Sequence, residues 1–164
     1  MEIPAPPPDP ILYRPNVAAI LRNEQQHILV AERINVSGAW QFPQGGVDEG
    51  ESHETALFRE LEEEIGVTKD MVRIVEQRDG YRYSFAKGRL KYGLFGGQEQ
   101  TYYLCDYLGT DADINLGTTH REFASFKWIA PGEFQLEWVP KFKRAVYHAV
   151  FRDFFGLDLQ QPPS

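Results

Sequence analysis

The sequence predicts an α+β protein, an α/β/α sandwich in which a mixed sheet lies between helices. Three observations support this fold class: several short, β-branched apolar runs, two segments with helical apolar spacing, and their order of strands, helix, strands, helix. A length of 164 residues is enough for one hydrophobic core. Hydrophobic residues at 42% and charged residues at 25% are typical of a globular chain and exclude a disordered or fibrous one.

The chain is expected to have three parts. Residues 1–12 are rich in proline and have little to bury, so we expect a flexible N-terminal arm. Residues 13–156 are expected to form the folded domain, and residues 157–164 a C-terminal tail.

The strands are predicted from short apolar runs. Residues 16–23 and 27–34 are such runs around a polar "NEQQ", which predicts a hairpin. The segment "AWQFPQGGVDEGES" predicts an aromatic strand that leads into a Pro/Gly-rich loop. The remaining predicted strands are "MVRIVEQ", "YRYSF", "QTYYLCDYL" and "FASFKWIA", with a basic, glycine-rich stretch at residues 87–97.

Two helices are predicted. The first begins after Ser52, a good N-cap residue, carries Glu54 in its first turn and ends at Gly66. Its apolar stripe consists of Leu57, Leu61 and Ile65. The second is expected over residues 139–155, with a stripe of Phe142, Val146, Val150 and Phe154.

Charge and cysteine content exclude several classes of protein. A net charge of −7 and a pI near 5.1 argue against a protein that covers long duplex nucleic acid. The single cysteine, Cys105, excludes an intramolecular disulfide framework. No apolar stretch approaches the ~20 residues of a membrane span. We therefore expect a cytoplasmic protein without a membrane partner, whose oligomeric state stays open.

The most informative segment is an acidic face on the first helix. Glu60, Glu63 and Glu64 fall within about 100° of one helix face. Acidic helix faces are usually just solvated, but here a Gly-Gly loop that can approach a ligand precedes the helix. Such carboxylates suit a hard cation, Mg²⁺ or Mn²⁺. Arg59 is expected to pair with Glu51 and fix the loop against the helix.

The spacing in this segment resembles a known family. Gly45, five residues, Glu51, seven residues and then "RELEEEIGV" match the Nudix box, G-x₅-E-x₇-R-E-U-x-E-E-x-G-U with U apolar. The resemblance implies a Nudix-type sandwich and hydrolysis of a nucleoside diphosphate linked to another group. It also implies Mg²⁺ or Mn²⁺ on Glu60, Glu63 and Glu64, with the carbonyl of Gly45 as an added ligand.

Other motifs are similar to two groups within that family. "YRPNVAAIL", "GQEQTYYL", "REFASFKWI" and "FKRAVYHAVFRDF" resemble bacterial RNA pyrophosphohydrolases and asymmetric diadenosine tetraphosphate hydrolases. The resemblance implies that Glu122 is a further metal ligand or the general base. The candidate catalytic residues are thus Arg59, Glu60, Glu63, Glu64 and Glu122.

The same resemblance implies substrate contacts. Arg14 and Arg33 match residues that contact phosphate or base, although arginines near strand ends are more often surface residues. Phe142 matches an aromatic that stacks on a base, yet it also fits the apolar stripe of its helix. Tyr83 is a candidate for the other side of the stack. Lys141, in a basic cluster beside Phe142, suits phosphate or a solvated helix face.

The substrate stays open between two classes. Glu32 and Thr101 stand where the RNA enzymes often carry basic residues, and "RINVSGAWQ" has the arginine-to-tryptophan spacing of the tetraphosphate group. We favour RNA 5′-triphosphate ends, with diadenosine tetraphosphate as the alternative main substrate. A nucleotide sensor without turnover is disfavoured because the box glutamates are intact. An isopentenyl diphosphate isomerase is disfavoured because a histidine-rich site is missing.

Overall fold

The structure is a computed structural model that describes residues 11–85 and 88–159. Most of the Pro-rich arm and the end of the tail, residues 160–164, lie outside the described residues. The strands are β1 (Tyr13–Arg22), β2 (Ile28–Arg33), β3 (Trp40–Gln41), β4 (Gln44–Gly46), β5 (Val72–Ser84), β6 (Gly97–Tyr107) and β7 (Phe123–Ile129). The α-helices are α1 (His53–Ile65) and α2 (Lys141–Phe155), and the short 3₁₀ helices are η1 (Lys69–Met71), η2 (Asp111–Asp113), η3 (Pro131–Glu133) and η4 (Leu136–Trp138).

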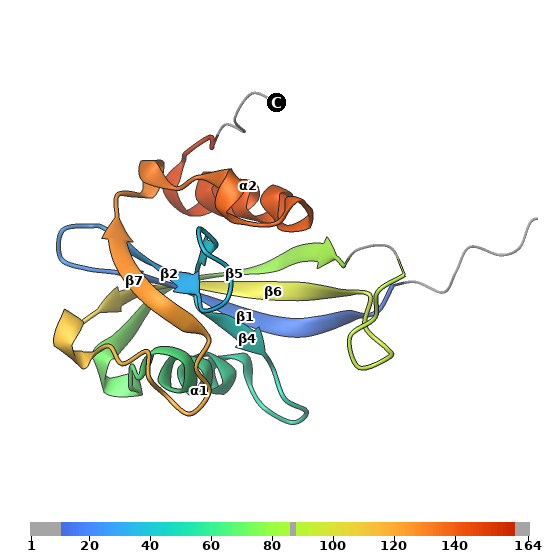
Figure 1. The fold of residues 1–164 in the computed structure, drawn as a ribbon, viewed down its shortest axis with the longest axis horizontal. Coiled ribbons are helices and arrows are strands. Elements are labelled where there is room, and N and C mark those ends of the chain that lie inside the picture. Colours follow the sequence, from blue (N-terminus) through green and yellow to red (C-terminus); the bar gives the residue numbers. More distant parts are fainter. Residues whose placement is uncertain (1–10, 86–87, 160–164) are drawn as a thin grey trace, which may run out of the picture.

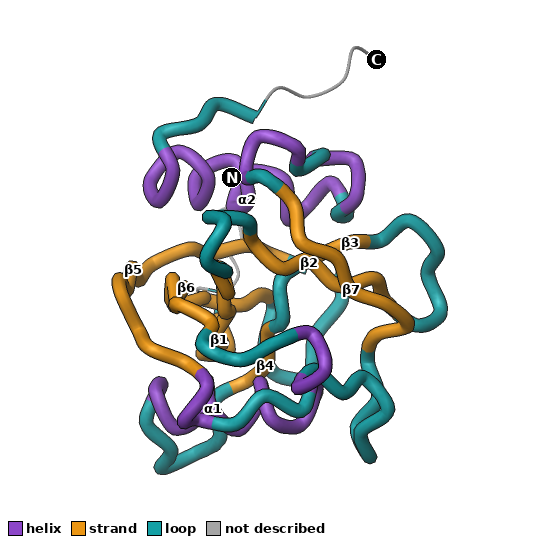
Figure 2. The backbone as a smooth tube through the Cα atoms, turned by 90° about the vertical axis from the view of Figure 1, so that its left-hand side faces the viewer, coloured by secondary structure: helices purple, strands orange, loops and turns teal. Residues whose placement is uncertain are grey.

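The predicted sandwich with a mixed sheet is confirmed. The main path of the sheet runs β3-β2-β1-β6-β5, while β4 pairs with β1 and β7 pairs with β2. Strands β1 and β6 are parallel, and the other pairs are antiparallel. Figure 1 shows α2 above the sheet and α1 below it, and Figure 2 shows the same layers from the side.

The predicted hairpin is present but splays after its turn. The Asn23 side chain accepts hydrogen bonds from the backbone N–H groups of Gln25 and His27, which closes the turn. Beyond the pair Arg22 and Ile28, β2 pairs with β7, and β1 pairs with β4. This split brings the glycine loop of β4 directly onto β1.

Strand β5 differs from the sequence prediction. The two predicted pieces are one strand, Val72–Ser84, whose register against β6 shifts between Ile74 and Glu76 and again between Arg78 and Tyr81. Irregularities of this kind accommodate extra residues without ending the ladder. The polar "RDG" therefore resembles a turn in the sequence although the strand continues through it.

Helix α1 follows its sequence signals. The Ser52 hydroxyl accepts a hydrogen bond from the Thr55 N–H at 3.1 Å, and Gly66 ends the helix with φ 70°. The predicted stripe is fully buried beneath the sheet. Anchoring this stripe fixes the rotation of the helix, so that Glu64 lies buried beside the stripe while Glu62 is exposed.

Helix α2 corrects two expectations. It begins at Lys141 because residues up to Trp138 form a 3₁₀ turn and Pro140 precedes the first helical residue. Its buried residues are Val146, Tyr147, Val150 and Phe151. The stripe is thus rotated from the predicted one, and Phe142, 41% exposed, extends past the edge of the core.

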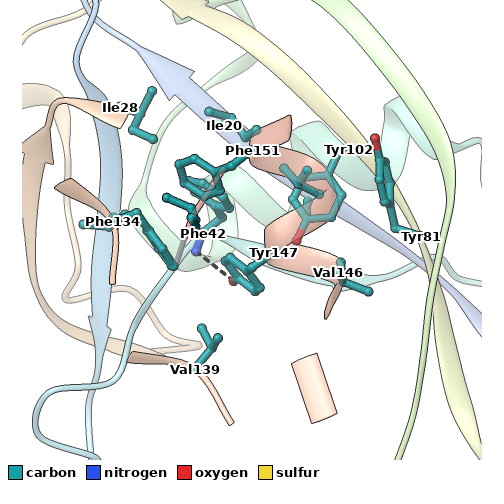
Figure 3. Packing of buried hydrophobic residues seen from close by; sticks show 14 of the residues in the cluster. Ile20, Ile28, Phe42, Tyr81, Tyr102, Phe134, Val139, Val146, Tyr147 and Phe151 are labelled. Carbon is teal, nitrogen blue, oxygen red and sulfur yellow. Dashed lines mark hydrogen bonds between the residues drawn. The ribbon is translucent and has the colours of Figure 1, made fainter. Parts of the chain in front are cut away.

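The core above the sheet contains a group of stacked aromatic rings among aliphatic side chains (Figure 3). The Phe42 ring lies parallel to Tyr147 at a centroid distance of 5.6 Å and is also stacked on Phe134 and Phe151. Leu159 is buried in the same cluster, so the chain packs on the core beyond residue 156. Since Phe42 lies just before β4, this stack anchors the glycine loop. Among the described residues, no helix is long and apolar enough to cross a membrane.

Candidate functional site

One cavity of about 860 Å³ brings most of the predicted site residues together. It lies where β1, β4, α1, β5 and the start of α2 meet. The predicted residues on its wall are Arg14, Arg33, Gly45, Glu60, Glu63, Glu64, Tyr83, Glu122 and Phe142. Because these residues are scattered from position 14 to position 142, their convergence supports the expectation that they share a site.

The acidic wall of the cavity is built on α1. Glu64 is only 6% exposed, and its Oε2 has no hydrogen-bond partner among the described residues. Burial raises the pKa of Glu64 well above its usual value, and the charges of Glu60 and Glu122 raise it further. Burial also raises the pKa of Glu60. Carboxylates in such a place require a positive partner to stay ionised.

The glycine loop fits tightly against this wall. A Cβ on Gly45 would lie 1.9 Å from the carboxyl carbon of Glu60, and a Cβ on Gly46 would lie 2.1 Å from the guanidinium carbon of Arg14. Both side chains therefore pack on bare backbone, which no other residue type allows. The glycine loop, which is expected to approach a ligand closely, is in close contact with two site residues, Glu60 and Arg14.

A buried network of side-chain amides supports the glycine loop. The Gln100 Nε2 donates to Asn16 Oδ1 at 2.9 Å and to Gln44 Oε1 at 2.5 Å, which connects β6, β1 and β4. The Gln44 backbone lies close enough to Glu64 to lower the pKa of that carboxyl slightly, against the larger effect of burial. Sequence reasoning missed this support, although Gln100 lies in the quoted "GQEQ" motif.

Arg59 connects the loop to the helix, as expected. It donates to both carboxylate oxygens of Glu51, at 2.8 and 2.9 Å, and to the Gly46 carbonyl at 2.9 Å. It also reaches Glu60 at 2.9 Å and Glu63 at 3.2 Å. The Arg59 guanidinium lowers the pKa of Glu51 to about 2. Arg59 is thus placed to orient the loop and two of the carboxylates.

The chemistry of this wall fits a hard divalent cation. The donors on Glu60, Glu63, Glu64 and Glu122 are carboxylate oxygens, and Oε2 of Glu64 is buried without a hydrogen-bond partner in the described part of the chain. Within residues 11–85 and 88–159, however, no three acidic, histidine or cysteine side chains already stand in a metal-ligand arrangement. Arg59 occupies oxygens of Glu60 and Glu63, so a cation has to compete with it.

A second part of the cavity lining, which we call the aromatic, basic wall, contains rings and cations. The Tyr83 and Phe142 rings lie with their centroids 5.6 Å apart, and the Lys143 ammonium lies 5.5 Å from the Tyr83 centroid. Burial lowers the pKa of Lys143 to about 8, and the charges of Arg33 and Lys91 contribute. Such a wall offers ring faces for a base and cations for phosphate.

Two polar atoms of this wall have no partner. The Tyr83 hydroxyl and the Gln98 Oε1 are buried without a hydrogen bond among the described residues.

Of the two lysines at the start of α2, only Lys143 lines the cavity. Lys141 is exposed and does not line it. On a helix these two lysines point in different directions, which the basic cluster in the sequence did not resolve.

Arg33 and Glu122 meet at the end of the β2–β7 ladder. Arg33 is the last residue of β2 and pairs in register with Phe123. The Glu122 carbonyl accepts a hydrogen bond from the Ile34 N–H at 2.9 Å. This pairing places a remote glutamate beside the α1 carboxylates, and the effect of Glu122 on the pKa of Glu64 reflects that proximity.

A comparison with known protein families supports the family resemblance that the sequence motif indicates. A family model described as the NUDIX domain matches residues 12–150. The chain belongs to the Nudix family. This Nudix chain is 40% identical over 153 residues to an RNA pyrophosphohydrolase of Rhodospirillum rubrum, with 92% of each chain covered. It is 42% identical over 147 residues to an RNA pyrophosphohydrolase of Cereibacter sphaeroides, covering 87% of this chain and 90% of the relative.

A solved structure agrees on the fold. The Nudix chain superimposes on the C. elegans Ap4A hydrolase with a TM-score of 0.58 at 22% identity, covering 88% of this chain and 98% of that one. At this identity the likeness concerns the fold alone.

Proposed function

We propose that this Nudix chain is a Mg²⁺- or Mn²⁺-dependent pyrophosphohydrolase of nucleoside polyphosphates, with RNA 5′-triphosphate ends as its main substrate. The observation that carries the proposal is a single cavity lined both by the α1 carboxylates and by aromatic and basic side chains. The names of the relatives in Rhodospirillum rubrum and Cereibacter sphaeroides support the choice of RNA. We propose that the chain acts in the cytoplasm.

The acidic wall would hold the cations. The ligands are Glu60, Glu63, Glu64 and Glu122, with the Gly45 carbonyl as a further oxygen. When bound, divalent ions neutralise phosphate charge and activate water for attack on phosphorus. Cations also explain how a chain of net charge −7 accepts a polyanion.

This chain's own residues would orient the substrate and the wall. Arg59 holds the glycine loop against α1, so the Gly45 carbonyl and the carboxylates keep a fixed relation. Arg14, packed on Gly46, and Arg33 would bind phosphate oxygens. Tyr83 and Phe142 would stack on a base, and Lys143 would contribute a positive charge beside them. Lys141 has no part in this proposal because it lies off the cavity wall.

The test is a side-by-side turnover assay with Mg²⁺. One substrate is a 5′-triphosphorylated RNA and the other is diadenosine tetraphosphate, because both present a nucleoside and a phosphate chain to the cavity. We expect faster release of pyrophosphate or phosphate from the RNA. Faster conversion of the tetraphosphate to ATP and AMP would instead make the dinucleotide the main substrate.

The assay needs two variants. Glu63→Gln should lose turnover of both substrates, whereas Glu62→Gln, on the exposed side of the same helix, should keep it. If the wild type turns over neither substrate, the chain is a nucleotide-binding module and the proposed hydrolase is wrong.

A further inference from the structure

A loop at the mouth of the cavity is not used by the proposed chemistry. We call residues 88–96, between β5 and β6, the mouth loop. Arg89, Leu90, Lys91 and Tyr92 line the same cavity as the carboxylates. A bridge between Lys91 and Phe95, with the Lys91 N–H donating to the Phe95 carbonyl at 2.8 Å, gives the loop a defined shape.

Tyr92 is held in an unusual position at the tip of this loop. Its backbone is left-handed, with φ 56°, and its side chain is 72% exposed. The ring covers the Arg14 guanidinium, whose carbon lies 5.1 Å from the ring centroid. Arg14 itself packs on Gly46, so ring, guanidinium and glycine loop are in continuous contact. An exposed ring is thus coupled directly to the loop of the site.

The surface around the mouth loop is apolar and basic. Ile11, Leu12, Leu90 and Leu94 are 49–55% exposed. The Gly96 N–H donates to the Leu12 carbonyl at 3.0 Å, which fastens the mouth loop to the chain before β1. The Lys91 ammonium lies 5.8 Å from the Tyr92 centroid, and Arg89 is exposed.

We propose that the mouth loop binds the single-stranded nucleotides that follow the reacting 5′ end of an RNA. Tyr92 offers a ring face for a base, and Arg89 and Lys91 offer positive charge to the next phosphates. Rings interleaved with cations are how proteins hold single strands without reading their sequence. This inference rests on the proposed function and adds a surface for RNA outside the reacting centre.

Two observations favour RNA over a protein partner. The mouth loop lines the same cavity as the carboxylates, so it is within reach of the nucleotides next to the reacting end. Its charge is positive on a protein whose net charge is −7, which matches phosphates. A dinucleoside polyphosphate ends in a nucleoside and carries no phosphates beyond it, so replacing Arg89 and Lys91 should weaken its turnover less than that of RNA.

The experiment compares a ten-nucleotide 5′-triphosphorylated RNA with diadenosine tetraphosphate. The variants are Tyr92→Ala, Tyr92→Phe and the double variant Arg89→Gln/Lys91→Gln. Arg73→Gln is the matched control, because Arg73 is also exposed but pairs with Asp106. We expect the ratio of kcat/KM for RNA to that for the dinucleotide to fall about tenfold in Tyr92→Ala. Tyr92→Phe and Arg73→Gln should keep the ratio.

A second readout separates stacking from charge. The Kd of the same RNA is measured in EDTA over a range of salt concentrations. Loss of two phosphate contacts should reduce the slope of log Kd against log salt by about 1.4 in the double variant. The slope should stay at the wild-type value in Tyr92→Ala.

The failures are distinguishable. If the wild type hydrolyses RNA but all variants keep its ratio and salt slope, the inference is overturned and the surface is left for a protein partner. If the wild type hydrolyses the dinucleotide alone, both this inference and the RNA preference are overturned, while the hydrolase remains. If neither substrate is turned over, the proposed function itself fails.

Discussion

The two walls of the cavity are built in different ways. The acidic wall comes mainly from one helix, α1, with the glycine loop pressed against it. The aromatic, basic wall is assembled from β5, the mouth loop, β6 and the start of α2. The first wall is local in the sequence, and the second exists only after the sheet has formed.

This difference divides the expected roles. The acidic wall holds buried carboxylates that need a cation, so changes there should affect the chemical step. The aromatic, basic wall offers ring faces and amphipathic cations, so changes there should affect substrate binding. The predictions below test this division, beginning with the largest expected effect.

Glu64→Gln should abolish most of the activity. It replaces a buried carboxyl, one of whose oxygens has no hydrogen-bond partner within residues 11–85 and 88–159, by a neutral group of the same shape. We expect kcat to fall on the order of 10²–10³-fold with Mg²⁺ present. The control is Glu62→Gln. A kcat within twofold of the wild type in Glu64→Gln would remove the acidic wall from the chemistry.

Arg59→Lys tests whether Arg59 positions the glycine loop for the reaction. Lysine keeps the charge but cannot donate to Glu51 with two parallel hydrogen bonds while it also contacts the Gly46 carbonyl. We expect kcat to fall on the order of 10–100-fold, with KM nearly constant, because the loop loses its orientation. Steady-state kinetics measure both, and a change confined to KM would contradict the assignment.

Phe142→Ala should weaken binding without weakening the fold. Phe142 is 41% exposed and contacts Tyr83 outside the buried stripe of α2. Loss of base stacking should raise KM about tenfold. Thermal unfolding should show a change of no more than about 0.5 kcal/mol. A large loss of stability with unchanged KM would instead indicate that Phe142 is a core residue.

The smallest effect concerns pH. Burial lowers the pKa of Lys143 to about 8, so raising the pH through that value removes a positive charge from the cavity. Phosphate binding should therefore weaken, and KM should rise several-fold between about pH 7 and about pH 9. Burial is the main cause of this pKa, the charges of Arg33 and Lys91 add to it, and the Tyr83 and Phe142 rings also face Lys143. Lys143→Arg stays charged, so its KM should not show this rise.

The two walls also differ in how well the sequence predicts them, and the acidic wall is the more predictable. The capped helix, its buried stripe and the three glutamates depend on spacing within one turn or two, and the structure has them as expected. The Arg59–Glu51 pair is similarly local. Such features are set by helix geometry, which is periodic along the chain.

The other wall depends on contacts that no local pattern encodes. Lys143 rather than Lys141 faces the cavity because the stripe of α2 is rotated toward Tyr147 and Phe151. The amide network under the loop joins three strands that are distant in the sequence, so its function as a support is visible only in the sheet. Tyr92 reaches Arg14 across the cavity mouth for the same reason.

The claim that the acidic wall is a divalent-cation site can be tested without any substrate. Mn²⁺ is titrated into the full chain, and bound ion is followed by electron paramagnetic resonance, for the wild type, Glu60→Gln/Glu64→Gln and Glu62→Gln. We expect saturable binding by the wild type and by Glu62→Gln, and its loss in the double variant. Undiminished binding in the double variant would place the cation elsewhere and contradict the account of the acidic wall.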